Sequence, residues 1–137
     1  EPFLYGGELS FQGRISLAGV QGLFDQVAAE GWTIISCAGH PDHVLNDEQR
    51  AFMTELGMTG WYLAAEEQKE KEALGGQAWD IDGSYRRYMQ RRGIEAFISR
   101  PDCNMFGAVK KLEELPLLLE ELRRQLSVFN KKQEELI

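Results

Sequence analysis

Cysteine, positive charge and long apolar runs are all scarce in this sequence, and each scarcity excludes a class of protein. Its 137 residues contain two cysteines, Cys37 and Cys103, which share no short motif and cannot build a disulfide framework. We therefore expect a reducing, cytoplasmic setting. No apolar run approaches the roughly 20 residues that a membrane-spanning helix needs, and no signal peptide is visible. The net charge of −7 argues against binding to nucleic acid or to an anionic membrane.

The familiar catalytic and nucleotide-binding motifs are also missing. The sequence contains no G-x-G-x-x-G fingerprint, no P-loop and no Ser/His/Asp set. Its 43% hydrophobic and 27% charged residues are nevertheless values typical of a globular protein. The length predicts one domain, which we place at residues 9–129, with an N-terminal linker at 1–8 and a tail at 130–137. Because the chain starts at Glu1 rather than Met, we expect a piece of a longer protein.

Changes of hydrophobic period divide the domain into alternating strands and helices. Alternation indicates strands, and apolar residues at i, i+3, i+4 and i+7 indicate helices. The resulting order, β-α-β-α-β-α-β-β-α, predicts an α/β protein with a mixed central sheet and helices on both faces, the element order of the thioredoxin fold. The expected strands are 9–17, 32–37, 59–64, 94–99 and 104–109, and the expected helices are 20–30, 46–57, 80–92 and 113–129.

Capping and turn residues support several of these boundaries. Asn46, with Gln49 three residues later, predicts a capping box at a helix start. Asp80 or Asp82 is expected to cap the helix that ends at Gly93, and Pro101 predicts a turn between the last two strands. The stretch 66–77 is expected to be a polar connection.

The place where a thioredoxin carries its C-x-x-C motif reads Cys37-Ala38-Gly39-His40, so the resolving cysteine is absent. The next helix is also expected to begin late, too far away to lower the pKa of Cys37. Glu95 stands where active members carry a cis-proline. These departures argue against dithiol chemistry. The alternative that remains is a free-standing oxidoreductase that uses Cys37 as a single thiol, resolved by a partner or by glutathione.

Two other groups of residues could bind a ligand. Cys37, His40 and His43 have the spacing C-x-x-H-x-x-H, which zinc could use, although no second pair of ligands is suitably spaced. We favour a polar surface loop over this metal-binding hypothesis. Four arginines lie on one expected helix and could bind an anion, but a solvated helix face is the preferred interpretation. They are Arg86, Arg87, Arg91 and Arg92.

Four stretches together resemble a known module. They are G-G-E-L-S-F-Q-G-R-I from Gly6, G-L-F-D-Q-V from Gly22, D-I-D-G-S-Y from Asp80 and R-P-D-C-N-M-F-G from Arg100. The chain, from about Gly6 to Ser127, resembles the C-terminal thioredoxin-like domain of FAD-dependent aromatic-ring hydroxylases of the phenol hydroxylase and 3-(3-hydroxyphenyl)propionate hydroxylase group.

That resemblance implies a redox-inactive accessory domain of a flavoprotein monooxygenase, with a structural or subunit-contact role. The family's FAD, NAD(P)H and substrate sites lie in preceding domains, so we expect no cofactor and no catalytic residue in this segment. The implied partners are the FAD-binding and substrate domains of the parent chain, or a second copy in a homodimer.

Overall fold

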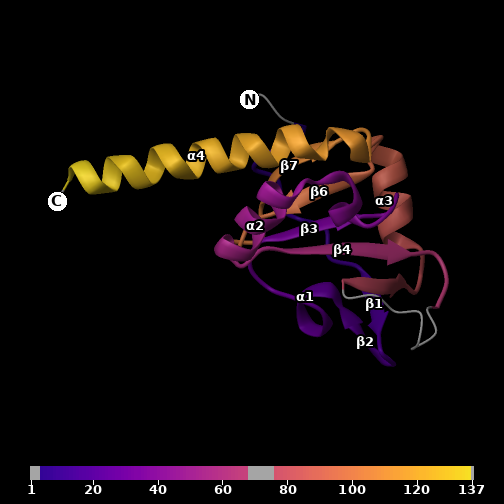
Figure 1. Cartoon of the computed structure of the whole chain (residues 1–137). Helices are drawn as coiled ribbons and strands as arrows, with labels where there is room; N and C mark the ends of the chain where they lie inside the picture. The colour runs from indigo at the N-terminus through magenta and orange to yellow at the C-terminus, as the bar shows by residue number, and fades with distance from the viewer. Residues whose placement is uncertain (1–3, 68–75, 137) are drawn as a thin grey trace.

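The computed structural model describes residues 4–67 and 76–136, and a seven-stranded mixed sheet forms its centre (Figure 1). The strand order across the sheet is β2-β1-β5-β4-β3-β6-β7. Strands β3, β4 and β5 run parallel, whereas every other neighbouring pair is antiparallel. The strands are β1 (Arg14–Leu17), β2 (Val20–Leu23), β3 (Thr33–Ser36), β4 (Thr59–Ala64), β5 (Gln77–Asp80), β6 (Ala96–Ser99) and β7 (Met105–Val109).

Helices cover both faces of the sheet. Neighbouring residues of one strand point to opposite faces, so Ile35 packs in a core beneath α1 and α3, whereas Ile34 packs in a second core beneath α2 and α4. The α/β architecture with a mixed sheet and helices on both faces is therefore confirmed. The helices are α1 (Phe24–Val27), α2 (Asp47–Leu56), α3 (Ser84–Arg92) and α4 (Leu115–Glu135), with 3-10 turns η1 (Pro41–Val44) and η3 (Leu112–Glu114).

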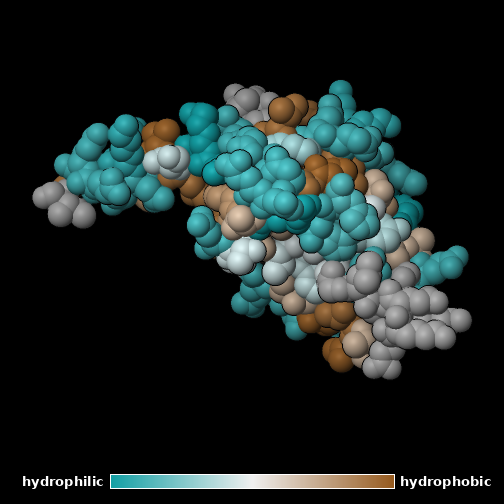
Figure 2. Space-filling view, viewed as in Figure 1, coloured by the Kyte–Doolittle hydropathy of each residue, from teal (hydrophilic) through white to brown (hydrophobic). Residues whose placement is uncertain are grey.

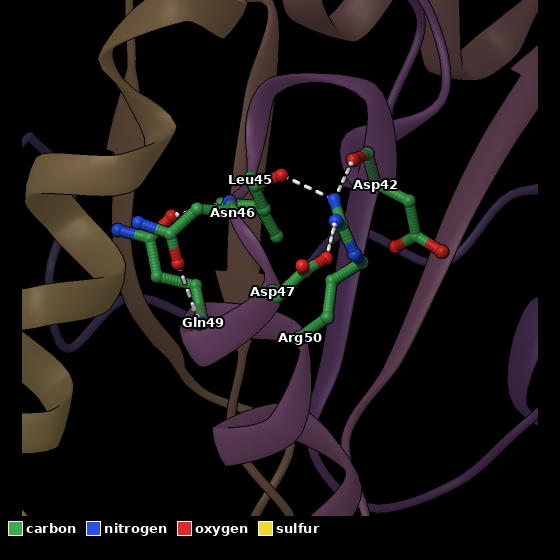
Figure 3. A network of polar contacts seen from close by, with 6 residues as sticks. All are labelled: Asp42, Leu45, Asn46, Asp47, Gln49 and Arg50. Carbon is green, nitrogen blue, oxygen red and sulfur yellow. Dashed lines mark hydrogen bonds and ion pairs between the residues drawn. The ribbon is translucent and has the colours of Figure 1, made fainter.

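The predicted capping box at the start of α2 is present (Figure 3). The Gln49 N–H donates to Asn46 Oδ1 over 2.8 Å, and the Asn46 N–H donates to Gln49 Oε1 over 2.9 Å. Gln49 also donates from Nε2 to Glu120 Oε2 over 3.0 Å, which ties α2 to α4. One local sequence signal thus fixes both the start of the helix and its attachment to the neighbouring helix.

The helix predicted over 20–30 is wrong. Residues 20–23 form β2, which pairs antiparallel with β1, and only the single turn of α1 follows. Ala18 and Gly19, with φ of 51° and 84°, make a two-residue turn between the paired residues Leu17 and Val20. Such a left-handed pair is the favoured connection of a hairpin. The turn overrides the helical spacing, and Val20 is 59% exposed rather than buried.

Other boundaries also differ from the expectation. The helix predicted over 80–92 begins at Ser84 as α3, because Asp80 belongs to a strand. The first predicted strand, 9–17, is shortened to β1, because Leu9 makes only an isolated bridge with Asn104 and is 75% exposed. The expected polar connection ends in a strand, since 77–80 form β5 between β1 and β4, while residues 68–75 lie outside the described part. The predicted tail from Asn130 is helical as far as Glu135, and this end of α4 extends beyond the body of the protein (Figure 1).

Within the described ranges 4–67 and 76–136, no helix is both long and apolar enough to cross a membrane.

Candidate functional site

Cys37 directly follows β3, at the carboxyl end of the parallel strands, where α/β proteins usually place their chemistry. Its side chain packs against the core beneath α1 and α3 and is only partly exposed. Burial raises the pKa of the Cys37 thiol from 9.0 to about 12, and the nearby Arg86 guanidinium offsets only part of this rise. The thiol is therefore protonated at neutral pH, although the thiolate is the nucleophilic form.

The helix that follows Cys37 does not activate it. As expected, α2 begins late: the turn η1 intervenes, and Asn46 caps the helix. Arg50 holds this intervening loop in place (Figure 3). Its Nη1 donates to the carbonyl oxygens of Asp42 and Leu45, and its Nη2 pairs with Asp47. The capping box of Asn46 and Gln49 satisfies the Gln49 N–H in the first turn of α2.

Glu95 lies immediately before β6, at the place expected from the sequence. Its Oε1 accepts a 2.8 Å hydrogen bond from the Leu112 N–H, and its Oε2 lies 3.9 Å from Lys111 Nζ. Its carbonyl oxygen accepts a hydrogen bond from the Cys37 N–H over 3.2 Å. The carboxylate therefore holds the turn η3 that leads into α4, a structural role that the sequence comparison with thioredoxins did not predict.

The two histidines near Cys37 take part in the loop structure. His40 is buried, and its Nδ1 accepts a 3.2 Å hydrogen bond from the Asp42 N–H. The ring of His43 is exposed and lies 5.8 Å from the His40 ring between centroids. Across residues 4–67 and 76–136, no three His, Cys, Asp or Glu side chains are grouped so as to hold a metal ion. The structure thus does not bring Cys37, His40 and His43 together as ligands.

A buried carboxylate near Cys37 has a clear role in the start of α3. Asp80 ends β5 and is 1% exposed. Its two oxygens accept hydrogen bonds from the Tyr85 N–H over 3.2 Å and from the Arg86 N–H over 3.1 Å. Asp82, the other predicted cap, instead pairs with Arg14 at the surface over 3.2 Å. Asp80 therefore both ends a strand and satisfies the N-terminal amides of the following helix.

The arginines of α3 point to different partners. Arg86 donates to the Leu63 carbonyl oxygen over 3.4 Å, and Arg87 donates to the Asp82 carbonyl oxygen over 2.8 Å. Arg92 pairs with Glu8 over 2.7 Å, whereas Arg91 is exposed. These guanidinium groups are dispersed over separate contacts, an arrangement that favours a structural helix face over one shared anion site.

An N-terminal strap, residues 4–10, lies along β7 and the adjoining turn, although residues 1–8 were expected to be a linker. Four backbone hydrogen bonds of 2.7–3.0 Å join the strap to residues 103–108. The Tyr5 hydroxyl donates to the Arg92 carbonyl oxygen over 2.9 Å, and the Arg92 guanidinium lies 4.6 Å from the centroid of the Tyr5 ring. The sequence analysis missed these contacts because the segment has no hydrophobic period.

Comparisons with known proteins place these features in a family. The model of the HcaD C-terminal domain matches residues 7–125. The probable NADH-specific resorcinol 4-hydroxylase of Rhodococcus jostii (strain RHA1) is 27% identical over 116 residues, which make 85% of this chain and 21% of that protein. The crystal structure of the flavin-dependent monooxygenase PieE, in complex with FAD and substrate, superposes with a TM-score of 0.57 at 17% identity, over 90% of this chain and 21% of that one.

These relatives are much longer than the chain, which spans about a fifth of their length. The likeness to PieE shows a shared fold, whereas the family model covers most of the sequence. The resemblance to the C-terminal domain of FAD-dependent aromatic hydroxylases, expected from the four sequence stretches, is confirmed. The chain belongs to the HcaD C-terminal domain family.

Proposed function

We propose that this chain is the C-terminal domain of a flavin-dependent aromatic hydroxylase, and that it acts through its surfaces rather than through a thiol or a metal. The observation that carries the proposal is the family match over residues 7–125. The named relatives, a resorcinol 4-hydroxylase and a flavin-dependent monooxygenase, support the activity of the parent protein. The burial of Cys37, which raises its pKa to about 12, supports the absence of thiol chemistry.

In this proposal, FAD and NAD(P)H bind to other domains of the parent chain. The relative from Rhodococcus is described as NADH-specific, and PieE was solved with FAD. The partners of this domain are then the FAD-binding and substrate domains of the same chain, with a homodimer as the alternative. Two free cysteines agree with a reducing, cytoplasmic setting.

We also infer that the fold is thioredoxin-like in its second half. Parallel β3 and β4 lie beside the antiparallel pair β6 and β7, and α2 and α4 share one face while α3 covers the other. The first half departs from the expected element order, because the hairpin of β1 and β2 and the strand β5 extend the sheet beyond β4. This extension explains why the element order predicted from the sequence was only partly correct.

The test begins with the gene that encodes the chain, which should carry a flavin-binding region upstream. The full-length protein should purify with bound FAD and oxidise NADH or NADPH when a phenol such as resorcinol is added. Cys37→Ser should leave the hydroxylation rate within about twofold of wild type, since a protonated thiol contributes no nucleophile. Cys103→Ser is the matched control, because Cys103 is exposed in the turn after β6. A full-length protein without flavin would contradict the proposal.

A further inference from the structure

A cleft opens at the other end of β3 from Cys37, between α1 and the turn that joins β6 to β7. Its volume of about 490 Å³ lies within the usual range for small-molecule sites. On the face shown in Figure 2, exposed hydrophobic side chains form small areas separated by hydrophilic ones. The cleft instead combines an apolar wall, a hydroxyl floor and a charged rim. Its lining includes Phe24, Asp25, Glu30, Thr33, Ser99 and Arg100.

The floor of the cleft carries two buried hydroxyl groups. Thr33 of β3 lies directly opposite Ser99 of β6 in the antiparallel register, so the two side chains stand on the same face of the sheet. The Ser99 hydroxyl lies 2.7 Å from the Ser10 hydroxyl. The Thr33 side chain, which is 3% exposed, has no hydrogen-bond partner within residues 4–67 and 76–136. A buried hydroxyl group gains stability from a partner, and a bound molecule can supply one.

The Thr33 hydroxyl opens into the cleft rather than into the core. Across the described ranges, Ser84 Oγ is the only partnerless side-chain oxygen or nitrogen that is sealed from solvent. Thr33 Oγ1 is therefore accessible, and the cleft is the space that Thr33 lines. A nearly buried hydroxyl group thus faces a cavity that can admit a ligand.

The rim of the cleft has a negative charge. Asp25 lies in the first turn of α1, and Glu30 follows that helix. In the described part of the chain, neither carboxylate has a hydrogen-bond or ion-pair partner. Arg100, on the facing side, already pairs with Asp102 over 2.7 Å. The rim therefore favours O–H or N–H donors and disfavours anions.

The wall of the cleft is apolar and held in place. Phe24 is 1% exposed, and its ring meets the Trp61 ring edge-on, with 5.5 Å between centroids. Ala29 and Pro101 complete the apolar lining. Because these residues are fixed before a ligand arrives, little ordering of the protein opposes binding.

We propose that this cleft binds a small neutral phenol, whose ring lies against Phe24 and whose hydroxyl group hydrogen-bonds to Thr33. A second hydroxyl group, as in a benzenediol, donates to Asp25 or Glu30. The choice of an aromatic ring rests on the proposed function, in which the parent protein hydroxylates such rings. The cleft is then a second phenol site, separate from the flavin-dependent active site in the other domains.

Titration of the 137-residue chain with resorcinol, followed by the amide resonances of its NMR spectrum, tests the proposal. The Thr33, Ser99 and Arg100 amides should shift saturably, with a dissociation constant on the order of 1 mM for so small a ligand. Thr33→Val removes the hydroxyl group but suits a strand, and it should weaken binding at least about fivefold. Thr54→Val is the matched control, because Thr54 is exposed on α2, on the other face of the sheet. It should leave the affinity unchanged.

A second titration tests the charge of the rim. 3,5-Dihydroxybenzoate carries the same two hydroxyl groups as resorcinol and an added carboxylate, so it should bind at least about fivefold more weakly. Replacing both rim carboxylates, by Asp25→Asn with Glu30→Gln, should bring the two affinities within about twofold of each other.

Three results would overturn the inference. They are the absence of a saturable shift up to about 20 mM resorcinol, an affinity in Thr33→Val equal to that of wild type, and a benzoate that binds wild type as tightly as resorcinol. Each result overturns this inference alone, because the flavin content of the full-length protein tests the proposed function separately.

Discussion

Replacing Asp80 with alanine should lower the free energy of unfolding by about 3 kcal/mol. Replacing an exposed carboxylate on the same loop should lower it far less. Asp80 is 1% exposed and accepts two hydrogen bonds, from the Tyr85 and Arg86 N–H groups. A hydrogen bond to a charged group contributes about 1.5–3 kcal/mol. The two do not simply add, because removing a buried charge also removes its desolvation cost. Leaving two helix N–H groups without an acceptor nevertheless keeps the net effect large.

Urea unfolding followed by circular dichroism at pH 7 measures this effect. Asp80→Asn keeps one acceptor oxygen and should cost about half as much as Asp80→Ala. Asp82→Asn is the control, because Asp82 pairs with Arg14 at the surface and such a pair contributes at most about 1 kcal/mol. The expected order of destabilisation is Asp80→Ala, then Asp80→Asn, then Asp82→Asn. An Asp80→Ala free energy of unfolding within about 0.5 kcal/mol of wild type would refute the capping role.

Two further predictions concern α4 and Cys37. Leu118→Ala should lower the free energy of unfolding by about 2–5 kcal/mol, since Leu118 is fully buried. Leu117→Ala should change it by less than about 0.5 kcal/mol, because Leu117 is 74% exposed. Urea titration of the two variants measures the difference, and equal effects would contradict the orientation of α4. The pKa of Cys37 is higher in the folded protein, at about 12, than its ordinary value of 9.0, so its stabilising contribution is complete below pH 9 and lost as the pH rises towards 12. The urea midpoint of unfolding should therefore decrease less between pH 9 and 11 in Cys37→Ser than in wild type. The remaining decrease is due to Tyr85, because burial raises its pKa as well. A decrease as large as that of wild type would count against the burial of the thiol.

The elements that could be predicted from the sequence were those with strong local signals. The capping box of Asn46 and Gln49, the glycine after α3 and the strand predicted at 94–99 each agree with the fold that surrounds them, although every residue of β6 is buried rather than every second one. The helix predicted over 20–30, where the structure has the hairpin of β1 and β2, was wrong for a physical reason. Val20, Leu23, Phe24 and Val27 share a helical period, but the Ala18-Gly19 turn pairs 20–23 with β1. Turn geometry outweighed a weak amphipathic pattern in a short segment.

The candidate site could be predicted in part. The sequence correctly places Cys37 directly after β3 and Glu95 directly before β6, and it shows that the resolving cysteine is missing. It could not show that Glu95 holds η3, nor that Asp80 is buried, because both depend on partners brought together by the sheet. The strap was missed for the same reason. Its backbone hydrogen bonds join residues 4–10 to residues 93–104 positions later, and no local pattern encodes such a pairing.

Turnover of a disulfide substrate by the purified chain, with glutathione as the reductant, tests the central claim most directly. The account predicts a rate equal to that of glutathione alone, for wild type and for Cys37→Ser alike, because the partly buried Cys37 thiol remains protonated at neutral pH. A turnover rate above that of glutathione alone would contradict this account if it is lost in Cys37→Ser and kept in Cys103→Ser. That result would make this domain a thiol oxidoreductase.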